Sequence, residues 1–97
     1  MSQIDQARER LRQGRGSLRC SELVSILEAF GFACRVRNRG NHHTVTHGHL
    51  KMREAGFYTA GFDGGHGNDP PVLPNYINDM RSLLNQYRDV LEEIGYD

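Results

Sequence analysis

Three histidines and a row of arginines lie close together in the middle of this chain. Residues 40–47 read Gly-Asn-His-His-Thr-Val-Thr-His, and an arginine stands at every second position before them, at Arg35, Arg37 and Arg39. Imidazole titrates nearest to neutral pH and can serve as a general acid or base. Guanidinium groups bind phosphate through charge-assisted hydrogen bonds. The segment therefore predicts a site for a phosphate-bearing ligand.

A pattern of alternating residues on both sides of a turn predicts the strands that hold these groups. Apolar and basic residues alternate over 32–37, which is typical of a strand with one apolar and one basic face. Gly40 and Asn41 tolerate the positive φ angles of a tight turn. We expect a second strand from about His42 to His47, so the two strands form a hairpin.

The period of two in a strand assigns each histidine to a face of the sheet. If Val45 faces the core, His43 and His47 share its side, because residues two apart point the same way. His42 and Thr44 then share the outer face with the arginines. The pattern therefore predicts an exposed imidazole at His42 and a half-buried one at His43.

Two helices are expected before these strands. The apolar residues of segment 20–30 fall at i, i+3, i+4 and i+7, the buried stripe of an amphipathic helix, and Gly31 can close it. Residues 3–13 predict a shorter helix with a thinner stripe. We interpret residues 1–17 as a leader, which is either a basic arm for RNA or a plain solvated segment.

A third strand and a last helix are expected in the second half. Residues 57–62 predict the strand, and proline at position 74 suits the first turn of a helix of about 20 residues. Its apolar residues are spaced 3, 4, 3, 4, 3, an uninterrupted a/d seam: Ile77, Met80, Leu84, Tyr87, Leu91 and Ile94. The seam either packs within the chain or forms a homodimer or partner interface through residues 77–94.

The order of these elements predicts an α+β fold of the α-β-β-β-α type. Short links between consecutive strands favour a three-stranded antiparallel sheet with the helices on one face. A helical extension precedes it and a long helix ends it. The chain has 97 residues, enough for one small core, so residues 18–97 are expected to form a single domain.

Composition excludes several classes of protein. No run approaches the roughly 18 apolar residues of a membrane span, and the first residues lack the pattern of a secretion signal, so we expect a soluble cytoplasmic protein.

The two cysteines and the charges give further information. Cys20 and Cys34 are not spaced like the ligands of a metal site, and we interpret them as two buried thiols. Residues 1–53 carry ten Arg and Lys against four Asp and Glu, whereas 54–97 carry two against eight. This asymmetry suggests a basic face for a polyanion.

The histidines also raise the alternative of a metal site, since imidazole is a common zinc ligand. His43 and His47 are four residues apart on the expected strand, which separates them by about 13 Å. That distance is too great for one ion, and His49, which is closer to His47, has no obvious carboxylate or cysteine partner. We therefore expect neither a metal nor another cofactor.

Three segments, in this order and spacing, resemble a known family. They are the helix and its Gly-Phe exit at 20–32, the turn Arg39-Gly40-Asn41-His42-His43, and His66 shortly before Leu73-Pro74. Over roughly residues 18–85 the chain is similar to the HicA toxins of bacterial type II toxin–antitoxin modules. The resemblance implies a double-stranded-RNA-binding-like fold and an endoribonuclease that cuts messenger RNA without a metal.

The resemblance also implies roles for particular residues. His42 takes the position of the family's essential histidine and would act as general acid or base. A cognate antitoxin of the HicB type would cover its face and neutralise the toxin. The residues expected to bind RNA are Arg35, Arg37, Arg39, Gly40, Asn41, Thr44 and His66.

A second interpretation stays open beside the ribonuclease. A non-catalytic RNA- or protein-binding module of the same fold, self-associating through its last helix, would suit the formal net charge of zero and the extended final helix. RNA cleavage that depends on His42 would favour the first interpretation, and intact RNA the second.

Overall fold

The helices of this chain pack against an antiparallel sheet. The computed structural model describes residues 2–36, 42–49, 59–65 and 67–96. In chain order its elements are α1 (Gln3–Gln13), α2 (Cys20–Glu28), β1 (Phe32–Val36), β2 (His42–His47), β3 (Ala60–Asp63), α4 (Pro74–Gln86) and α5 (Arg88–Glu93). The α+β fold expected from the sequence is confirmed.

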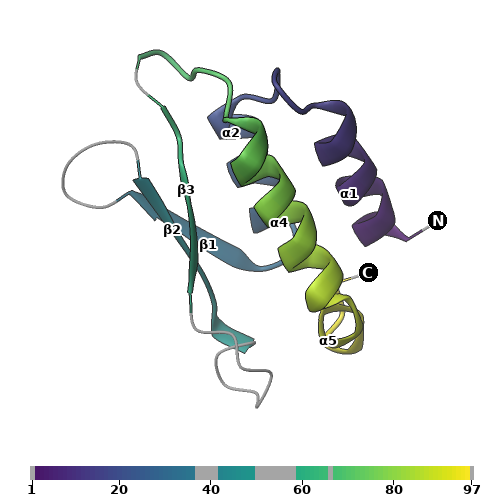
Figure 1. The fold of residues 1–97 in the computed structure, drawn as a ribbon. Coiled ribbons are helices and arrows are strands. Elements are labelled where there is room, and N and C mark those ends of the chain that lie inside the picture. Colours follow the sequence, from purple (N-terminus) through teal and green to yellow (C-terminus); the bar gives the residue numbers. More distant parts are fainter. Residues whose placement is uncertain (1, 37–41, 50–58, 66, 97) are drawn as a thin grey trace.

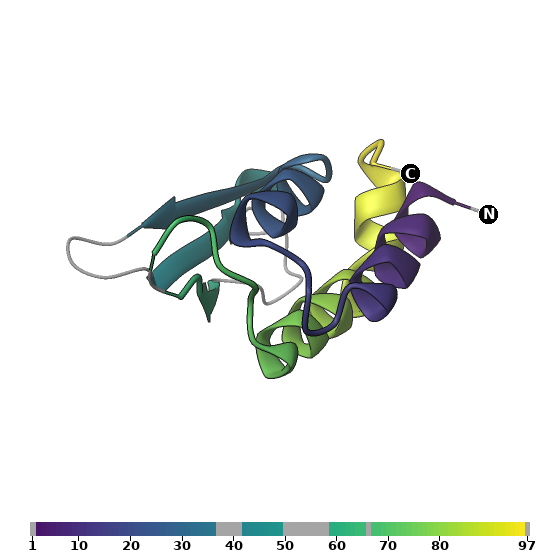
Figure 2. The same cartoon turned by 90° about the horizontal axis from the view of Figure 1, so that it is seen from above.

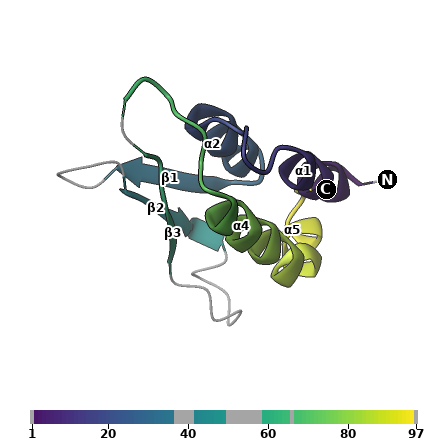
Figure 3. The ribbon, with the colours of Figure 1, turned by 45° about the horizontal axis from the view of Figure 1, so that its top comes forward.

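The sheet is an antiparallel meander in which β2 lies between β1 and β3 (Figure 3). Cys34 of β1 stands opposite Val45, and Asp63 of β3 stands opposite His42. β2 has the bounds that the sequence predicts. β3 is seen from Ala60, because the earlier part of the expected strand, residues 57 and 58, lies outside the described residues.

The helices lie on one side of the sheet. Figures 1 and 2 show α2 and α4 beside the sheet and α1 and α5 beyond them. The inner face of the sheet and these helices share one apolar core. Its fully covered side chains include Ile4, Leu11, Leu23, Leu27, Val45, Phe62, Ile77, Leu84 and Leu91. The outer face of the sheet carries no helix in the described part of the chain.

Helix α1 belongs to this core even though its apolar stripe is thin. The Ser2 side chain caps the helix by accepting a hydrogen bond from the Asp5 amide at 3.1 Å. Ile4 and Leu11 are fully buried, and α1 packs along α4. The leader therefore begins with an ordered helix, as the sequence predicts, and that helix is docked rather than solvated.

The long C-terminal helix is present as two helices rather than one. α4 begins with Pro74 in its first turn and ends at Gln86, and Tyr87 leaves the helical conformation with φ −107° and ψ 15°. α5 then sets off in a new direction (Figure 1). The bend lets Tyr87 and Leu91 both enter the core, where they are 7% and 0% exposed. The a/d seam is thus covered by its own chain.

The helices of the described residues have one apolar and one polar side. In α4, for example, Ile77 and Met80 are buried whereas Asn78 and Asp79 are exposed. None of these helices combines the length and the apolar character needed to cross a membrane.

Candidate functional site

His42 opens β2 on the outer face of the sheet, and its side chain is exposed. Thr44 lies two residues further along the same face, and Arg35 of β1 stands opposite Thr44. Arg35 is exposed as well, so its guanidinium is available to solvent. The strand parity predicted from the sequence is confirmed for these residues. The outer face thus presents an imidazole, a hydroxyl and a guanidinium together.

A shallow hollow adjoins His42 on this face. It has a volume of about 380 Å³ and is lined by His42, Thr44, Thr59, Ala60 and Gly61. Gly61 stands opposite Thr44 in β3. A Cβ atom at Gly61 would lie only 2.8 Å from His42 Nε2, so the imidazole rests against bare backbone. The hollow therefore owes its form to small side chains beside the histidine.

Asp63 is a neighbour of this site that the sequence analysis did not identify. It stands directly opposite His42, and side chains opposite one another in an antiparallel pair lie on the same face. One of its carboxylate oxygens accepts a hydrogen bond from the Gly65 amide at 3.0 Å. Only the register between β2 and β3 shows that Asp63 lies beside His42. This register cannot be predicted from the sequence before the ends of both strands are known.

His47 lies on the inner face and is a structural residue. It is 1% exposed, and its Nε2 lies 2.8 Å from the Phe30 carbonyl oxygen. Since a carbonyl only accepts, Nε2 carries the proton and donates it. Burial, opposed by this hydrogen bond and aided by His49, lowers the pKa of His47 below its ordinary value. The ring also meets Phe32 and Tyr96 edge-on.

His43 shares the inner face and is 9% exposed. Its ring stacks on Phe62, with centroids 4.7 Å apart and planes 4° from parallel. Its Nε2 lies 3.6 Å from Cys20 Sγ. The expectation of a half-buried His43 is thus confirmed and exceeded, because the ring is almost fully covered.

A second, larger pocket lies on this inner side, between the start of α2 and the segment after β3. Its volume is about 480 Å³, and both Cys20 and His43 line it. The sequence pattern does not predict this pocket, because Asp69, which lines one side, is distant in the chain from Cys20 and His43. The two thiols were interpreted as buried, but both cysteines are free and only half-buried.

Asp69 anchors that segment to the helix. Its carboxylate accepts hydrogen bonds from the Ser21 amide at 2.9 Å and from the Ser21 hydroxyl at 2.5 Å. These two bonds are the main reason why its pKa is lowered. A carboxylate at the start of a helix also interacts favourably with the positive end of the helix dipole. The start of α2 is therefore already capped by the chain itself.

The remaining residues expected at the site cannot be placed. Arg37, Arg39, Gly40, Asn41 and His66 lie outside the described residues. Of the residues expected to act on RNA, the structure brings together His42, Thr44 and Arg35. Within the described ranges, no three His, Cys, Asp or Glu side chains are grouped so that they could hold a metal ion.

Comparison with known proteins found no matching family model, no matching curated protein and no matching solved structure.

Proposed function

We propose that this chain is a HicA-like, RNA-binding endoribonuclease that cuts messenger RNA, with His42 as its general acid or base. The observation that supports this most is the exposed His42 imidazole, which stands beside a hollow on the outer face of the sheet. A catalytic histidine must reach its substrate, and the two neighbouring histidines of β2 are turned into the core.

The proposed reaction is an attack by a ribose 2′-oxygen on the adjacent phosphorus. The bond from phosphorus to the 5′-oxygen breaks, which leaves a 2′,3′-cyclic phosphate and a free 5′-hydroxyl. His42 takes the proton from the 2′-hydroxyl or gives one to the leaving oxygen, and general acid–base help of this kind contributes about 10² to 10⁴ in rate. The reaction needs no metal ion.

Arg35 is the described residue best placed to hold the phosphate. It is a diagonal neighbour of His42 on the outer face, and such neighbours in an antiparallel pair have Cα atoms about 7 to 8 Å apart. A long arginine side chain spans that gap. Its charge would stabilise the extra negative charge on the phosphorane-like transition state.

Regulation by a partner follows from the same surface. A cognate antitoxin of the HicB type would neutralise the enzyme by covering His42 and Arg35, since both are exposed on the outer face of the sheet. The homodimer through residues 77–94 would have to use the polar sides of α4 and α5, because the apolar seam of these helices faces its own core.

The test is a cleavage assay on single-stranded RNA. We expect His42→Ala to cut at least about 100-fold more slowly than the wild type. His49→Ala is the matched control, because His49 is also an exposed histidine of the same segment but does not line the hollow. An RNA carrying a 2′-deoxy sugar at the cleaved position should stay intact, and excess chelator should leave the rate unchanged. Equal rates for wild type and His42→Ala would refute the assignment.

A non-catalytic RNA- or protein-binding module is the alternative, and the formal net charge of zero favours it. A protein of this kind would bind labelled RNA, which raises the anisotropy of the label, but would not cleave it. In that case Arg35→Ala should weaken RNA binding, whereas His42→Ala should change it little.

A further inference from the structure

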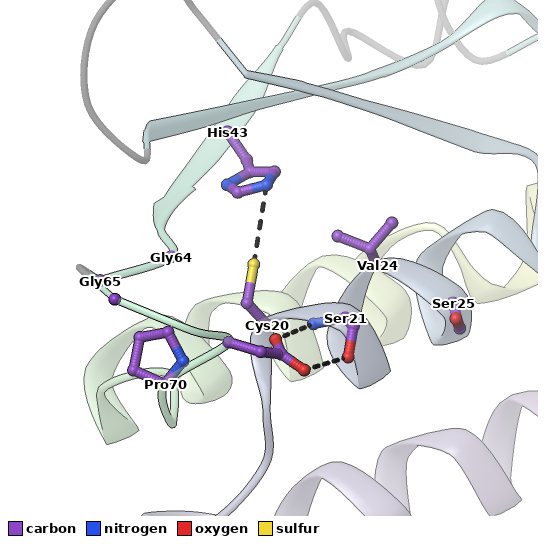
Figure 4. A pocket seen from close by; sticks show the side chains of 10 residues that line it. Cys20, Ser21, Val24, Ser25, His43, Gly64, Gly65 and Pro70 are labelled. Carbon is purple, nitrogen blue, oxygen red and sulfur yellow. Dashed lines mark hydrogen bonds between the residues drawn. The ribbon is translucent and has the colours of Figure 1, made fainter.

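A cysteine and a histidine from different elements meet at the inner pocket. Cys20 is the first residue of α2, and its Sγ lies 3.6 Å from His43 Nε2 on β2 (Figure 4). This distance is within the range of a hydrogen bond that involves sulfur. A thiol beside an imidazole is the arrangement in which the imidazole can remove the thiol proton.

The histidine of this pair is held in place by its surroundings. Its ring is 9% exposed and stacks on Phe62 with a centroid distance of 4.7 Å. Phe62 is itself fully buried. The packing therefore fixes the plane of the imidazole and keeps Nε2 directed at the sulfur, as Figure 4 shows.

The pair opens onto space that a small molecule can occupy. The pocket has a volume of about 480 Å³, which falls within the usual range of small-molecule sites. Gly64 and Gly65 form part of one wall, and the Ser21 and Ser25 side chains lie on the helix side. The thiol is only half-buried, so a reagent can approach it from the pocket.

The environment of Cys20 favours the protonated thiol, so a nearby base would help to form the reactive thiolate. Burial and, to a smaller degree, the negative charge of Asp69 raise the pKa of the Cys20 thiol. The thiol therefore keeps its proton at neutral pH, and only the thiolate attacks a disulfide. His43 is the group in contact with the sulfur that can take this proton.

We propose that Cys20 is a site of thiol–disulfide exchange at which a small disulfide of the glutathione class becomes attached, with His43 as the base. The Cys20 proton passes to His43 Nε2 while the sulfur attacks one sulfur of the disulfide. The disulfide bond of the reagent breaks as the new bond forms, and the leaving thiolate takes the proton from His43. The disulfide is the only oxidant needed, and the exchange does not depend on RNA cleavage.

The second cysteine of the chain is an internal control. Cys34 lies on β1, and burial, followed by the charges of Glu28 and Cys20, raises its pKa to about 11. It is not among the residues that line the pocket. Cys34 therefore shows how fast a half-buried thiol reacts outside the pocket, and the His43→Asn variant separates the effect of the base from the effect of the thiol pKa.

The experiment follows adduct formation with oxidised glutathione by intact-protein mass. The Cys34→Ser variant, which keeps Cys20, should gain one glutathione roughly tenfold faster at neutral pH than the Cys20→Ser variant, which keeps Cys34. In the Cys34→Ser background, His43→Asn should slow the reaction roughly tenfold. Faster modification of Cys34 than of Cys20 would overturn the proposal.

A pH profile of the Cys34→Ser protein tests the role of His43 without disturbing the stack on Phe62. An unassisted thiol with a raised pKa loses rate about tenfold for each pH unit below it. If His43 removes the thiol proton, the rate should instead fall by much less than tenfold per pH unit from about pH 8 to about pH 7. A decline that stays tenfold per unit throughout this range would remove His43 from the mechanism, even if His43→Asn fails to fold.

Discussion

The two faces of β2 use histidine in opposite ways. His42 stands exposed beside a hollow on the outer face, whereas His47, five residues later, is 1% exposed and bonded to a backbone carbonyl. The same side chain is available to a substrate in the first case and forms part of the core in the second. A cluster of histidines in a sequence is therefore not a cluster of equivalent imidazoles, because strand parity separates them.

The inner face also differs from the outer face in how closely it is packed. Phe62 lies under His43, and Tyr96 closes over His47. On the outer face, the His42 ring rests against Gly61, which has no side chain. Substitutions in the packed part of the inner face should therefore act on stability, and substitutions beside His42 on the outer face should act on RNA cleavage.

The largest loss of stability is expected at the centre of the inner face. Phe62→Ala should lower the free energy of unfolding by about 3 to 5 kcal/mol, because it leaves a cavity and removes the stack on His43. Thr44→Ala on the outer face is the control and should cost about 0.5 kcal/mol. Urea unfolding measures both. Similar losses at the two positions would contradict the contrast between the faces.

The next effect is expected at Gly31, where β1 approaches the end of the chain. Its φ is +86°, and an added Cβ would lie 2.6 Å from the Tyr96 ring and 2.7 Å from His47 Nε2. Gly31→Ala should therefore cost about 2 to 4 kcal/mol, from backbone strain and displaced rings.

Gly16→Ala is a matched control for this variant. Gly16 has φ +87°, but an added Cβ would meet nothing within 4 Å. Gly16→Ala should lower the free energy of unfolding by only about 1 kcal/mol, from backbone strain alone. The difference between the two variants in thermal or urea unfolding isolates the packing of Tyr96 and His47. Equal losses would mean that this packing contributes nothing.

A smaller effect on stability is expected from protonation of His47. The fold lowers its pKa below the ordinary value of 6.5, chiefly by burial. As the pH falls through 6.5, the unfolded chain takes up the proton first, so the unfolded state gains stability relative to the fold. The contribution of neutral His47 to the free energy of unfolding is therefore complete above pH 6.5 and is lost progressively below it.

Urea unfolding at about pH 8 and about pH 5.5 measures this loss. His47→Gln is the informative variant, since its side-chain amide can still donate to the Phe30 carbonyl but does not titrate in this range. The variant should show a flatter dependence on pH than the wild type. An unchanged slope would mean that other groups carry the dependence.

A small change in stability is expected at Gly61 on the outer face, where the main readout is activity. Gly61→Ala brings a methyl group within 2.8 Å of His42 Nε2 and should displace the imidazole. A misplaced catalytic group costs up to about 100-fold in rate. We expect RNA cleavage to fall markedly while urea unfolding changes by about 1 kcal/mol or less. Full activity in this variant would argue against His42 as the reacting group.

Local patterns were enough to predict much of this fold. The period of two in segment 42–47 assigned His42 to the outer face and His47 to the core, and the structure confirms both. The helical stripe in 20–30 and the proline at the start of α4 were equally readable. In each case the spacing of apolar residues within a short segment shows which side chains face the core, so no distant residue is needed for the prediction.

The bend and the inner pocket could not be predicted, for two different reasons. The a/d spacing continues through Tyr87 without a break, so the sequence pattern does not mark the position where the helix ends and the chain turns. The pocket depends on the bonds between Ser21 and Asp69, which are 48 residues apart. No local pattern joins such positions, so the meeting of Cys20 with His43 was equally hidden.

The docking of α1 along α4 has a consequence for synthesis of the protein. Helix α1 is synthesised before α4 and finds this packing partner only after residues 74–86 have been made. Until then Ile4 and Leu11 have no α4 to cover them. Long-range contacts of this kind also slow folding, because distant parts of the chain must meet first. The segment of α1 should therefore become protease-resistant only after residues 74–86 have emerged from the ribosome.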